Sequence, residues 1–229
     1  MKANNLRDLV SWLMKHLTDT QFKGIENVPD TGGVLIATNH LSRMDIPVMF
    51  MIPNRPEMTA LVATKYLKYP LIRWFIVSAN GIWLDRDTAD FGAFRSAVKA
   101  LEEGKAVGIA PEGTRSKSGQ LQEGKPGTAL LALRAHVPII PVAITGTIGS
   151  FKKTVTFRHP SISAEFGPLI PAPVLERGNR EAQLQSITEE LMCQIAAMLP
   201  ESYRGFYKDH PRTRELLAQR EAAAKTSAA

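Results

Sequence analysis

The sequence predicts an α/β fold: a single domain in which a mixed, largely parallel sheet is flanked by helices, with an amphipathic helix at the N-terminus. Short apolar, β-rich runs alternate with segments of helical composition, the pattern of a mostly parallel sheet. The 229 residues, 44% of them hydrophobic, suit one substantial core better than two domains. Polar clusters follow several predicted strands, where folds of this class place their functional loops.

The chain is expected to open with an amphipathic helix within residues 1–20. Apolar residues recur there at helical spacing, and basic residues lie among them. The apolar positions are Leu6, Leu9, Val10, Leu13 and Leu17, with Trp12 beside them, and the basic ones are Lys2, Arg7, Lys15 and His16. Such a helix suits the headgroup region of a membrane. The alternative is an ordinary core-facing helix.

The folded domain is expected to span residues 21–218. The predicted strands are 33–38, 58–63, 81–84, 105–110, 139–144, 155–157 and 162–166. The predicted helices are 46–51, a segment from Asp87 or Thr88 to Glu103, 127–135 and 181–199, with Gly104 as a helix stop. Residues 219–229 are rich in alanine and small polar side chains, which predicts a frayed tail.

The first polar cluster joins a histidine to a carboxylate five residues later. On a helix, residues i and i+5 point about 140° apart, so His40 and Asp45 can meet only where the chain turns. The sequence supplies that turn, because His40 follows a predicted strand and Asp45 lies near the next helix start. The alternatives are a helix cap at Asp45 and a packed histidine at His40, and the spacing alone favours these alternatives.

The second cluster, Pro111 to Ser116, brings one acid, one glycine and one arginine to the loop after the strand at 105–110. Glycine lets the backbone approach a ligand closely, and the planar fork of arginine suits phosphate. Carboxyl ends of parallel strands meet at one edge of a sheet. We therefore expect both clusters in one site.

Four ordered blocks resemble the glycerolipid acyltransferase family, whose best-known members are the 1-acyl-sn-glycerol-3-phosphate acyltransferases. The blocks are Asn39-His40-x-Ser42-x-x-Asp45, Gly81-Ile82-Trp83-Leu84-Asp85-Arg86, Pro111-Glu112-Gly113-Thr114-Arg115-Ser116 and Val137-Pro138-Ile139-Ile140-Pro141-Val142-Ala143. The likeness runs from about Phe22 to Gly146, more than half of the chain. It departs from the family at 65–67, which is Lys-Tyr-Leu where many relatives have Lys-Glu-Leu.

The resemblance implies an enzyme that moves a fatty acyl group from a thioester to the hydroxyl of lysophosphatidic acid. His40 would be the general base, and Asp45 would hold its imidazole. Arg115 is the first choice for the acceptor phosphate, with Lys65 and Arg86 as second choices. The further site residues are Glu112, Gly113, Thr114, Asn39 and Ser42. Glu112 would orient Arg115 or contact the acceptor. The implied co-substrate is acyl-CoA or acyl carrier protein, with no cofactor and no metal.

Other chemistries have weaker support in the sequence. The sequence contains no Gly-x-Ser-x-Gly block, so it does not suggest a serine acyl-enzyme. The five histidines are scattered and Cys193 is the single cysteine, which favours neither a metal site nor a disulfide framework and fits a reducing compartment. Residues 119–125 match the glycine and lysine spacing of a phosphate loop, but Pro126 stands where a serine or threonine is needed.

The formal net charge of +6 and a pI near 9.5 indicate an anionic partner. No 18-residue uncharged apolar stretch and no signal pattern occur, so we expect a peripheral protein on the cytoplasmic face of a membrane. Residues 65–76 interleave cations with aromatics as membrane interfaces do, although a core face is the alternative. Nucleic acid is not expected, because the basic residues are dispersed and no binding signature occurs.

Three other functions stay open on the sequence alone. An enzyme with the same base could acylate another phosphate-bearing lysolipid. A thioester hydrolase would use that base on water. A catalytically idle lipid-binding relative is the third alternative, and the intact pair of His40 and Asp45 disfavours it.

Overall fold

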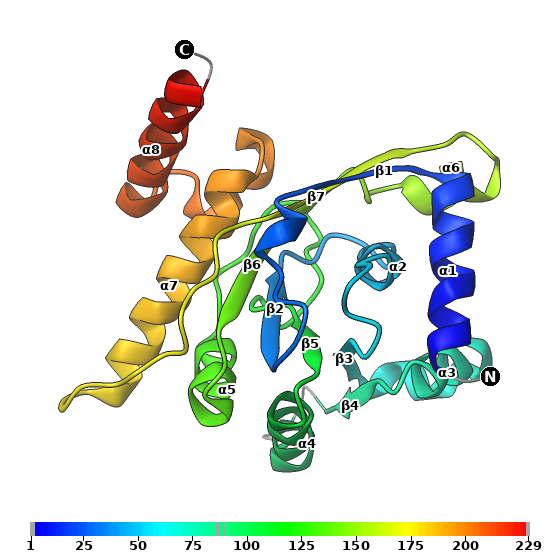
Figure 1. Ribbon diagram of the computed structural model, residues 1–229, viewed down its shortest axis with the longest axis horizontal. Helices are drawn as coiled ribbons and strands as arrows, with labels where there is room; N and C mark the ends of the chain where they lie inside the picture. The colour runs from blue at the N-terminus through cyan, green and yellow to red at the C-terminus, as the bar shows by residue number, and fades with distance from the viewer. Residues whose placement is uncertain (1–2, 86–87, 89, 228–229) are drawn as a thin grey trace.

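A seven-stranded sheet forms the centre of the protein in a computed structural model that describes residues 3–85, 88 and 90–227 (Figure 1). The strands are β1 (Asp19–Lys23), β2 (Val34–Thr38), β3 (Thr59–Ala63), β4 (Ile82–Leu84), β5 (Ala106–Ile109), β6 (Ile139–Thr145) and β7 (Ser161–Phe166). Their order across the sheet is β1-β7-β6-β2-β5-β3-β4. This architecture confirms the predicted α/β fold with a largely parallel sheet.

Helices cover both faces of this sheet (Figure 1). The α-helices are α1 (Ala3–Leu17), α2 (Asp45–Phe50), α3 (Pro70–Ser78), α4 (Phe91–Glu102), α5 (Gly127–Ala135), α6 (Ser150–Val155), α7 (Arg180–Met198) and α8 (Pro211–Ser227). The short 3-10 helices are η1 (Ile25–Asn27), η2 (Thr64–Lys68), η3 (Glu201–Tyr203) and η4 (Gly205–Tyr207). None of the helices described here is both long enough and apolar enough to cross a bilayer.

The strand directions bring distant loops to one edge. Strands β2 to β6 run parallel, because β2 pairs in parallel with β5 and β6, and β3 pairs in parallel with β5 and β4. Strand β7 is antiparallel to β6, and β1 runs parallel to β7. The loops that leave β2, β3, β5 and β6 therefore emerge from the same edge, as in other parallel α/β sheets.

Strand β2 lies in the middle of the sheet, and all five of its residues are buried. Val34 and Ile36 pack on one face with residues of α1 and α2, whereas Leu35 and Ala37 pack on the other face with residues of α4, α5 and α7. A strand covered on both faces needs a continuous apolar run rather than an alternating one. The run from Val34 to Ala37 meets that requirement.

Helix α1 is fixed to the end of α2. The guanidinium of Arg7 donates to the carbonyls of Phe50 and Ile52, and the Ser11 hydroxyl donates to the Phe50 carbonyl at 3.0 Å. These donors satisfy carbonyls that the end of a helix leaves without an intrahelical partner. The helix that begins at Asp45 is thereby anchored at its far end.

Two of the predicted elements are wrong, and one observed strand was not predicted. The predicted strand at 155–157 is wrong, because α6 occupies Ser150–Val155 and the amide of Thr156 donates to the Lys152 carbonyl. Local helical hydrogen bonds outweigh the β-branched composition there. The prediction of a frayed tail is also wrong as far as Ser227, because α8 continues to that residue. Alanine, glutamate and lysine, which are common in this segment, are strong helix formers. Strand β1 was not predicted, because its polar sequence lacks an apolar run.

The start of α4 lies further along the chain than Asp87 or Thr88. Helix α4 begins at Phe91, and the carboxylate of Asp90 caps it by accepting from the Ala93 amide at 2.8 Å. The same carboxylate accepts from the Asp85 amide at 2.9 Å. Asp90 therefore joins the end of the β4 segment to the start of α4.

Candidate active site

His40 and Asp45 meet at the junction between β2 and α2. One oxygen of the nearly buried Asp45 carboxylate, Oδ2, accepts from His40 Nδ1 at 2.8 Å. The same oxygen accepts from the amides of Leu41 and Ser42, each at 2.8 Å. The His40 side chain keeps 17% of its surface exposed. The structure thus brings together the pair that the spacing indicated.

The hydrogen-bond partner of Nδ1 determines which nitrogen of the neutral imidazole carries the proton. A carboxylate only accepts hydrogen bonds, so Nδ1 carries the proton in the neutral ring and Nε2 keeps its lone pair. Asp45 is the first residue of α2, and its carboxylate binds the preceding loop. An ordinary helix cap would instead accept from the second or third helical amide. This arrangement leaves Nε2 available as a base.

Thr147 supports the other oxygen of the carboxylate. Its hydroxyl donates to Asp45 Oδ1 at 2.6 Å, and the residue is fully buried. Thr147 follows the end of β6 and lies 102 residues after Asp45 in the chain. Thr147 was not among the predicted site residues, although a polar residue just after a strand is the signal that identified the other loops. Four donors consequently hold the Asp45 carboxylate in one orientation.

Glu112 binds the backbone of His40. Its Oε1 accepts from the His40 amide at 2.8 Å, and its Oε2 accepts from the amide of Gln122 at 2.9 Å. The Ser116 amide donates to the His40 carbonyl at 2.8 Å. The loop after β5 therefore holds both sides of the His40 backbone. The carboxylate is buried and both its oxygens are bonded, which gives Glu112 a structural role; its orientation of Arg115 or contact with the acceptor stays a prediction.

Gly113 gives the same loop its tight turn. Its φ is +70°, a conformation that favours glycine. A Cβ atom at this position would lie 3.2 Å from Cδ and 3.4 Å from Nζ of Lys125. The Lys125 side chain thus lies against the turn that carries Arg115. In the sequence, Lys125 stands out only as part of a phosphate-loop match, and nothing there indicates this placement.

The predicted phosphate-binding cations have different positions. Arg115 is exposed and precedes Ser116, the residue bonded to His40. Lys65 is exposed in η2, just after β3, with its ammonium 5.4 Å from the centre of the Tyr66 ring. Arg86 lies outside the described residues. Of Arg115 and Lys65, Arg115 is the one that directly precedes a residue bonded to the His40 backbone.

The remaining predicted site residues have structural hydrogen bonds. Asn39 is fully buried, and its side chain donates to the Ile144 carbonyl at 2.9 Å and accepts from the Ile144 amide at 2.7 Å. Both ends of its amide are thus bonded to β6, so Asn39 links the two strands, and its predicted place among the substrate-site residues stays a prediction. The Ser42 hydroxyl accepts from the Met44 amide at 3.1 Å, and the Thr114 carbonyl accepts from Gln122 at 3.4 Å.

No group of three or more metal-binding side chains occurs in the part of the chain that the structure describes. The chemistry that the site itself offers is proton transfer at His40, with fixed positive charge on the neighbouring loop.

Burial raises the pKa of the Glu112 carboxyl above its ordinary value. Folding then favours the protonated form, so stability from this group is present at low pH and is lost as pH rises through the raised pKa. Glu112→Gln removes this titration. In denaturant unfolding at pH 4 to 8, we expect the free energy of unfolding of the variant to rise relative to that of the wild type as pH rises.

The variant also turns an amide donor toward Gln122, which adds a pH-independent loss. The raised pKa is therefore tested only by how the difference in unfolding free energy between the variant and the wild type changes with pH. Parallel pH profiles for the two proteins would show that the Glu112 carboxyl does not titrate abnormally.

Comparison with known proteins identifies the family. The model of the family described as "Acyltransferase" matches residues 19–145. The 1-acyl-sn-glycerol-3-phosphate acyltransferase of Borreliella burgdorferi is 28% identical over 172 residues, which cover 74% of this chain and 68% of that protein. The 1-acyl-sn-glycerol-3-phosphate acyltransferase of Limnanthes douglasii is 34% identical over 138 residues, which cover 58% of this chain and 48% of that protein. The chain thus spans about half the length of the plant relative.

The fold has a solved counterpart. The crystal structure of the 1-acyl-sn-glycerophosphate (LPA) acyltransferase PlsC from Thermotoga maritima matches with a TM-score of 0.59 and 22% identity, covering 80% of this chain and 76% of that one. The resemblance that the four sequence blocks indicated is confirmed, because the family match takes in more than half of the chain, including His40, Asp45 and the Glu112 loop. The chain belongs to the acyltransferase family.

Proposed function

We propose that this acyltransferase moves a fatty acyl group from a thioester to the free hydroxyl of lysophosphatidic acid and so forms phosphatidic acid. The observation that carries the proposal is the hydrogen-bonded pair of His40 and Asp45, joined through the His40 backbone to the loop that bears Arg115. The names of the similar proteins support the choice of acceptor.

The reaction begins with proton removal from the acceptor hydroxyl. His40 Nε2 takes this proton as the hydroxyl oxygen bonds to the thioester carbonyl carbon, and Asp45 stabilises the imidazolium that forms. The tetrahedral intermediate then collapses, the carbon–sulfur bond breaks, and the imidazolium returns the proton to the departing thiolate. General-base help of this kind is worth roughly 10² to 10⁴ in rate. The cycle requires no covalent acyl-enzyme.

The acceptor phosphate would be bound by cations around the loop after β5. Arg115 is the principal candidate, since a guanidinium binds phosphate through two parallel hydrogen bonds. Lys125 adds a second positive charge, because its side chain packs against Gly113 of the same turn. Lys65 and Arg86 follow the parallel strands β3 and β4 and are the further candidates.

The donor in this proposal is acyl-CoA or an acylated carrier protein, and the reaction uses neither a metal nor a bound cofactor. A thioester is already an activated acyl group, so a base and an oriented hydroxyl are sufficient for the transfer.

We further place the enzyme on the cytoplasmic face of a membrane as a peripheral protein. Helix α1 divides into two surfaces: Leu6 and Met14 are buried in the protein, whereas Leu9, Trp12 and Leu13 are exposed. Amphipathic helices with an exposed tryptophan bind in the headgroup region of a bilayer. Such a position would give the site access to a lipid acceptor.

Replacement of the base should remove transfer. We expect His40→Ala to lower kcat by about 10² to 10⁴, the usual contribution of a general base. A radiolabelled acyl donor with lysophosphatidic acid and other lysolipids as acceptors measures the product. Donor consumption without acceptor reports thioester hydrolysis. Undiminished transfer by His40→Ala would refute the assigned base, and free fatty acid as the main product would favour a hydrolase.

Arg115→Ala should chiefly weaken acceptor binding. We expect the KM for lysophosphatidic acid to rise about tenfold or more, because a charge-assisted contact to phosphate contributes roughly 1.5–3 kcal/mol. The matched control is Lys117→Ala, which removes an exposed cation two residues away in the same loop. Equal effects of both substitutions would indicate general loss of positive charge and would contradict a specific phosphate contact at Arg115.

Thr147→Val should lower kcat with little change in KM. Valine keeps the shape of threonine but leaves Asp45 Oδ1 without its buried donor, so the imidazole support is weakened; we expect a loss of about tenfold. Thr147→Ser keeps the hydroxyl and should restore most of the activity. Thermal unfolding of both variants separates this effect from loss of folding. Equal kcat for the valine and serine variants would exclude the positioning role.

A further inference from the structure

The basic residues are dispersed along the chain, but two segments carry basic residues without any acidic residue. Residues 58–84 and 147–164 contain no aspartate or glutamate and carry six basic residues, namely Lys65, Lys68, Arg73, Lys152, Lys153 and Arg158. These six equal the formal net charge of +6, so the rest of the chain balances 22 basic against 22 acidic residues. An anionic partner would therefore be attracted to these two segments rather than to the surface as a whole.

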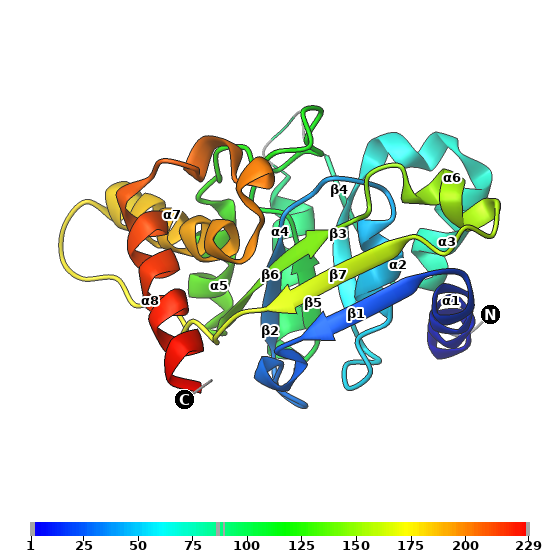
Figure 2. The same ribbon diagram turned by 90° about the horizontal axis from the view of Figure 1, so that it is seen from above.

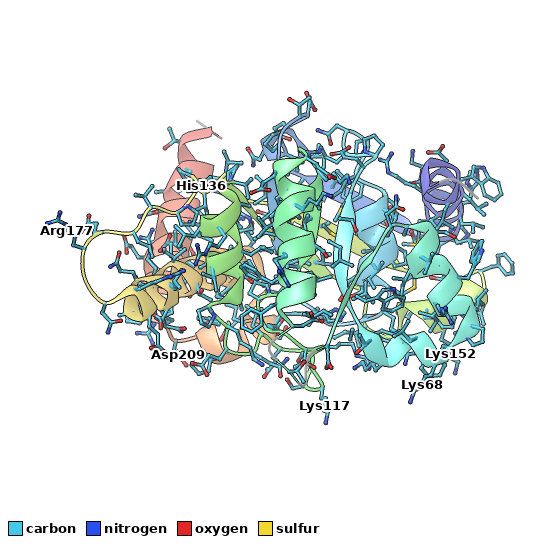
Figure 3. All side chains as sticks on the ribbon, turned by 90° about the horizontal axis from the view of Figure 1, so that it is seen from below. Lys68, Lys117, His136, Lys152, Arg177 and Asp209 are labelled. Atoms are coloured by element: carbon cyan, nitrogen blue, oxygen red, sulfur yellow. The ribbon has the colours of Figure 1, made fainter. Side chains whose placement is uncertain are left out.

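The two segments lie at the same end of the molecule. Figures 1 and 2 both place α3 and α6 at the end of the sheet where α1 lies, away from α7 and α8. Figure 3 shows Lys68 and Lys152 projecting from the same side of the molecule, as Lys117 of the active-site loop does, and Figure 1 places α3 and α6 at the two ends of α1. The concentrated charge therefore flanks the edge of the sheet that carries the candidate active site.

Large apolar side chains are exposed between these cations. Leu71 of α3 is 78% exposed, and Phe151 and Phe157 of the α6 segment are 65% and 73% exposed. Further exposed apolar residues of the two segments are Trp74, Val77, Ile148 and Val155. Exposed apolar patches of this kind mark interaction sites, and cations mixed with aromatic residues are typical of a bilayer interface.

The turn after α6 gathers three cations around one cleft. Phe157 has a φ of +54°, uncommon for a bulky side chain, and its amide donates to the Thr154 carbonyl. The next amide, that of Arg158, donates to the Lys153 carbonyl at 2.9 Å. The chain thereby folds back on α6, and Lys152, Lys153 and Arg158 all border the same cleft. Such a site matches the charge of a lipid phosphate.

We propose that residues 148–158, together with η2 and α3, form a docking surface for an anionic bilayer, with lipid phosphate in the cleft bordered by Lys152, Lys153 and Arg158. A bilayer explains both the cations and the exposed apolar side chains, whereas nucleic acid would account only for the cations. The proposal rests on the proposed function in one respect: the acceptor would arrive from the same bilayer.

Vesicle binding tests the surface without reference to catalysis. The probes are phosphatidylcholine vesicles with and without about 30 mol% phosphatidylglycerol, and sedimentation measures the bound fraction. The triple variant K152Q/K153Q/R158Q should bind the anionic vesicles roughly 10- to 100-fold more weakly, because each basic residue near such a surface adds about a factor of five. The vesicles without phosphatidylglycerol should show little difference.

The matched control is R134Q/R177Q/R180Q, which removes the same charge from exposed residues. Figure 3 shows His136 and Arg177 at the end of the molecule opposite Lys152. We expect this control to bind nearly as well as the wild type. Equal weakening by both triple variants would overturn the proposal, since net charge alone would then govern binding. Undiminished binding by K152Q/K153Q/R158Q would also overturn it.

The apolar part of the surface needs its own variant. F151S/V155S/F157S keeps every charge and should weaken binding to both kinds of vesicle, because it removes apolar area that enters the interface. Unchanged binding by this variant would contradict insertion of the α6 segment. All three side chains are exposed, so thermal unfolding should match the wild type and confirm that the variant folds.

Acyl transfer to a short-chain, monomeric lysophosphatidic acid without vesicles separates this proposal from the proposed function. The variants K152Q/K153Q/R158Q and F151S/V155S/F157S should keep wild-type transfer there. Normal vesicle binding by a protein without transfer activity would refute only the proposed function. Loss of soluble transfer in K152Q/K153Q/R158Q would refute a role confined to docking.

Discussion

The site depends on the fixed orientation of one carboxylate. Asp45 accepts four hydrogen bonds, from the His40 ring, the amides of Leu41 and Ser42, and the Thr147 hydroxyl. Three donors belong to the turn between β2 and α2, and the fourth comes from the end of β6. A carboxylate held in this way can fix the tautomer of its histidine only if the two strands keep their register.

The parallel sheet is what keeps these groups together. Strand β2 lies between β5 and β6, so the loops after all three strands emerge side by side. The β5 loop then binds the His40 backbone through Glu112 and Ser116, while Asn39 binds β6. The base is therefore held by its backbone as well as by its ring. Arg115 remains exposed in the same loop, where a charged acceptor can reach it.

The distribution of charge connects the site with the surface around it. The acid-free segments carrying η2, α3 and α6 lie at the end of the sheet next to the active-site edge (Figure 3). An enzyme with a lipid acceptor needs its site open toward the bilayer and its cations directed to the headgroups. The direct chain connection from Thr147 to α6 means that one short segment serves both the carboxylate and this surface.

The sequence alone determined the α/β class, most strands, and the pairing of His40 with Asp45 near Arg115, because apolar periodicity and short motifs are local signals. It missed the helical α6 and α8, and it did not reveal the buried hydrogen bonds that join Glu112 to the His40 backbone and Asn39 to β6. Only the tertiary structure decided that Thr147 supports Asp45, that Lys125 lies on Gly113, and that the two basic segments lie at the same end of the molecule. These contacts join residues far apart in the chain, and their partners are set by strand order rather than by local composition.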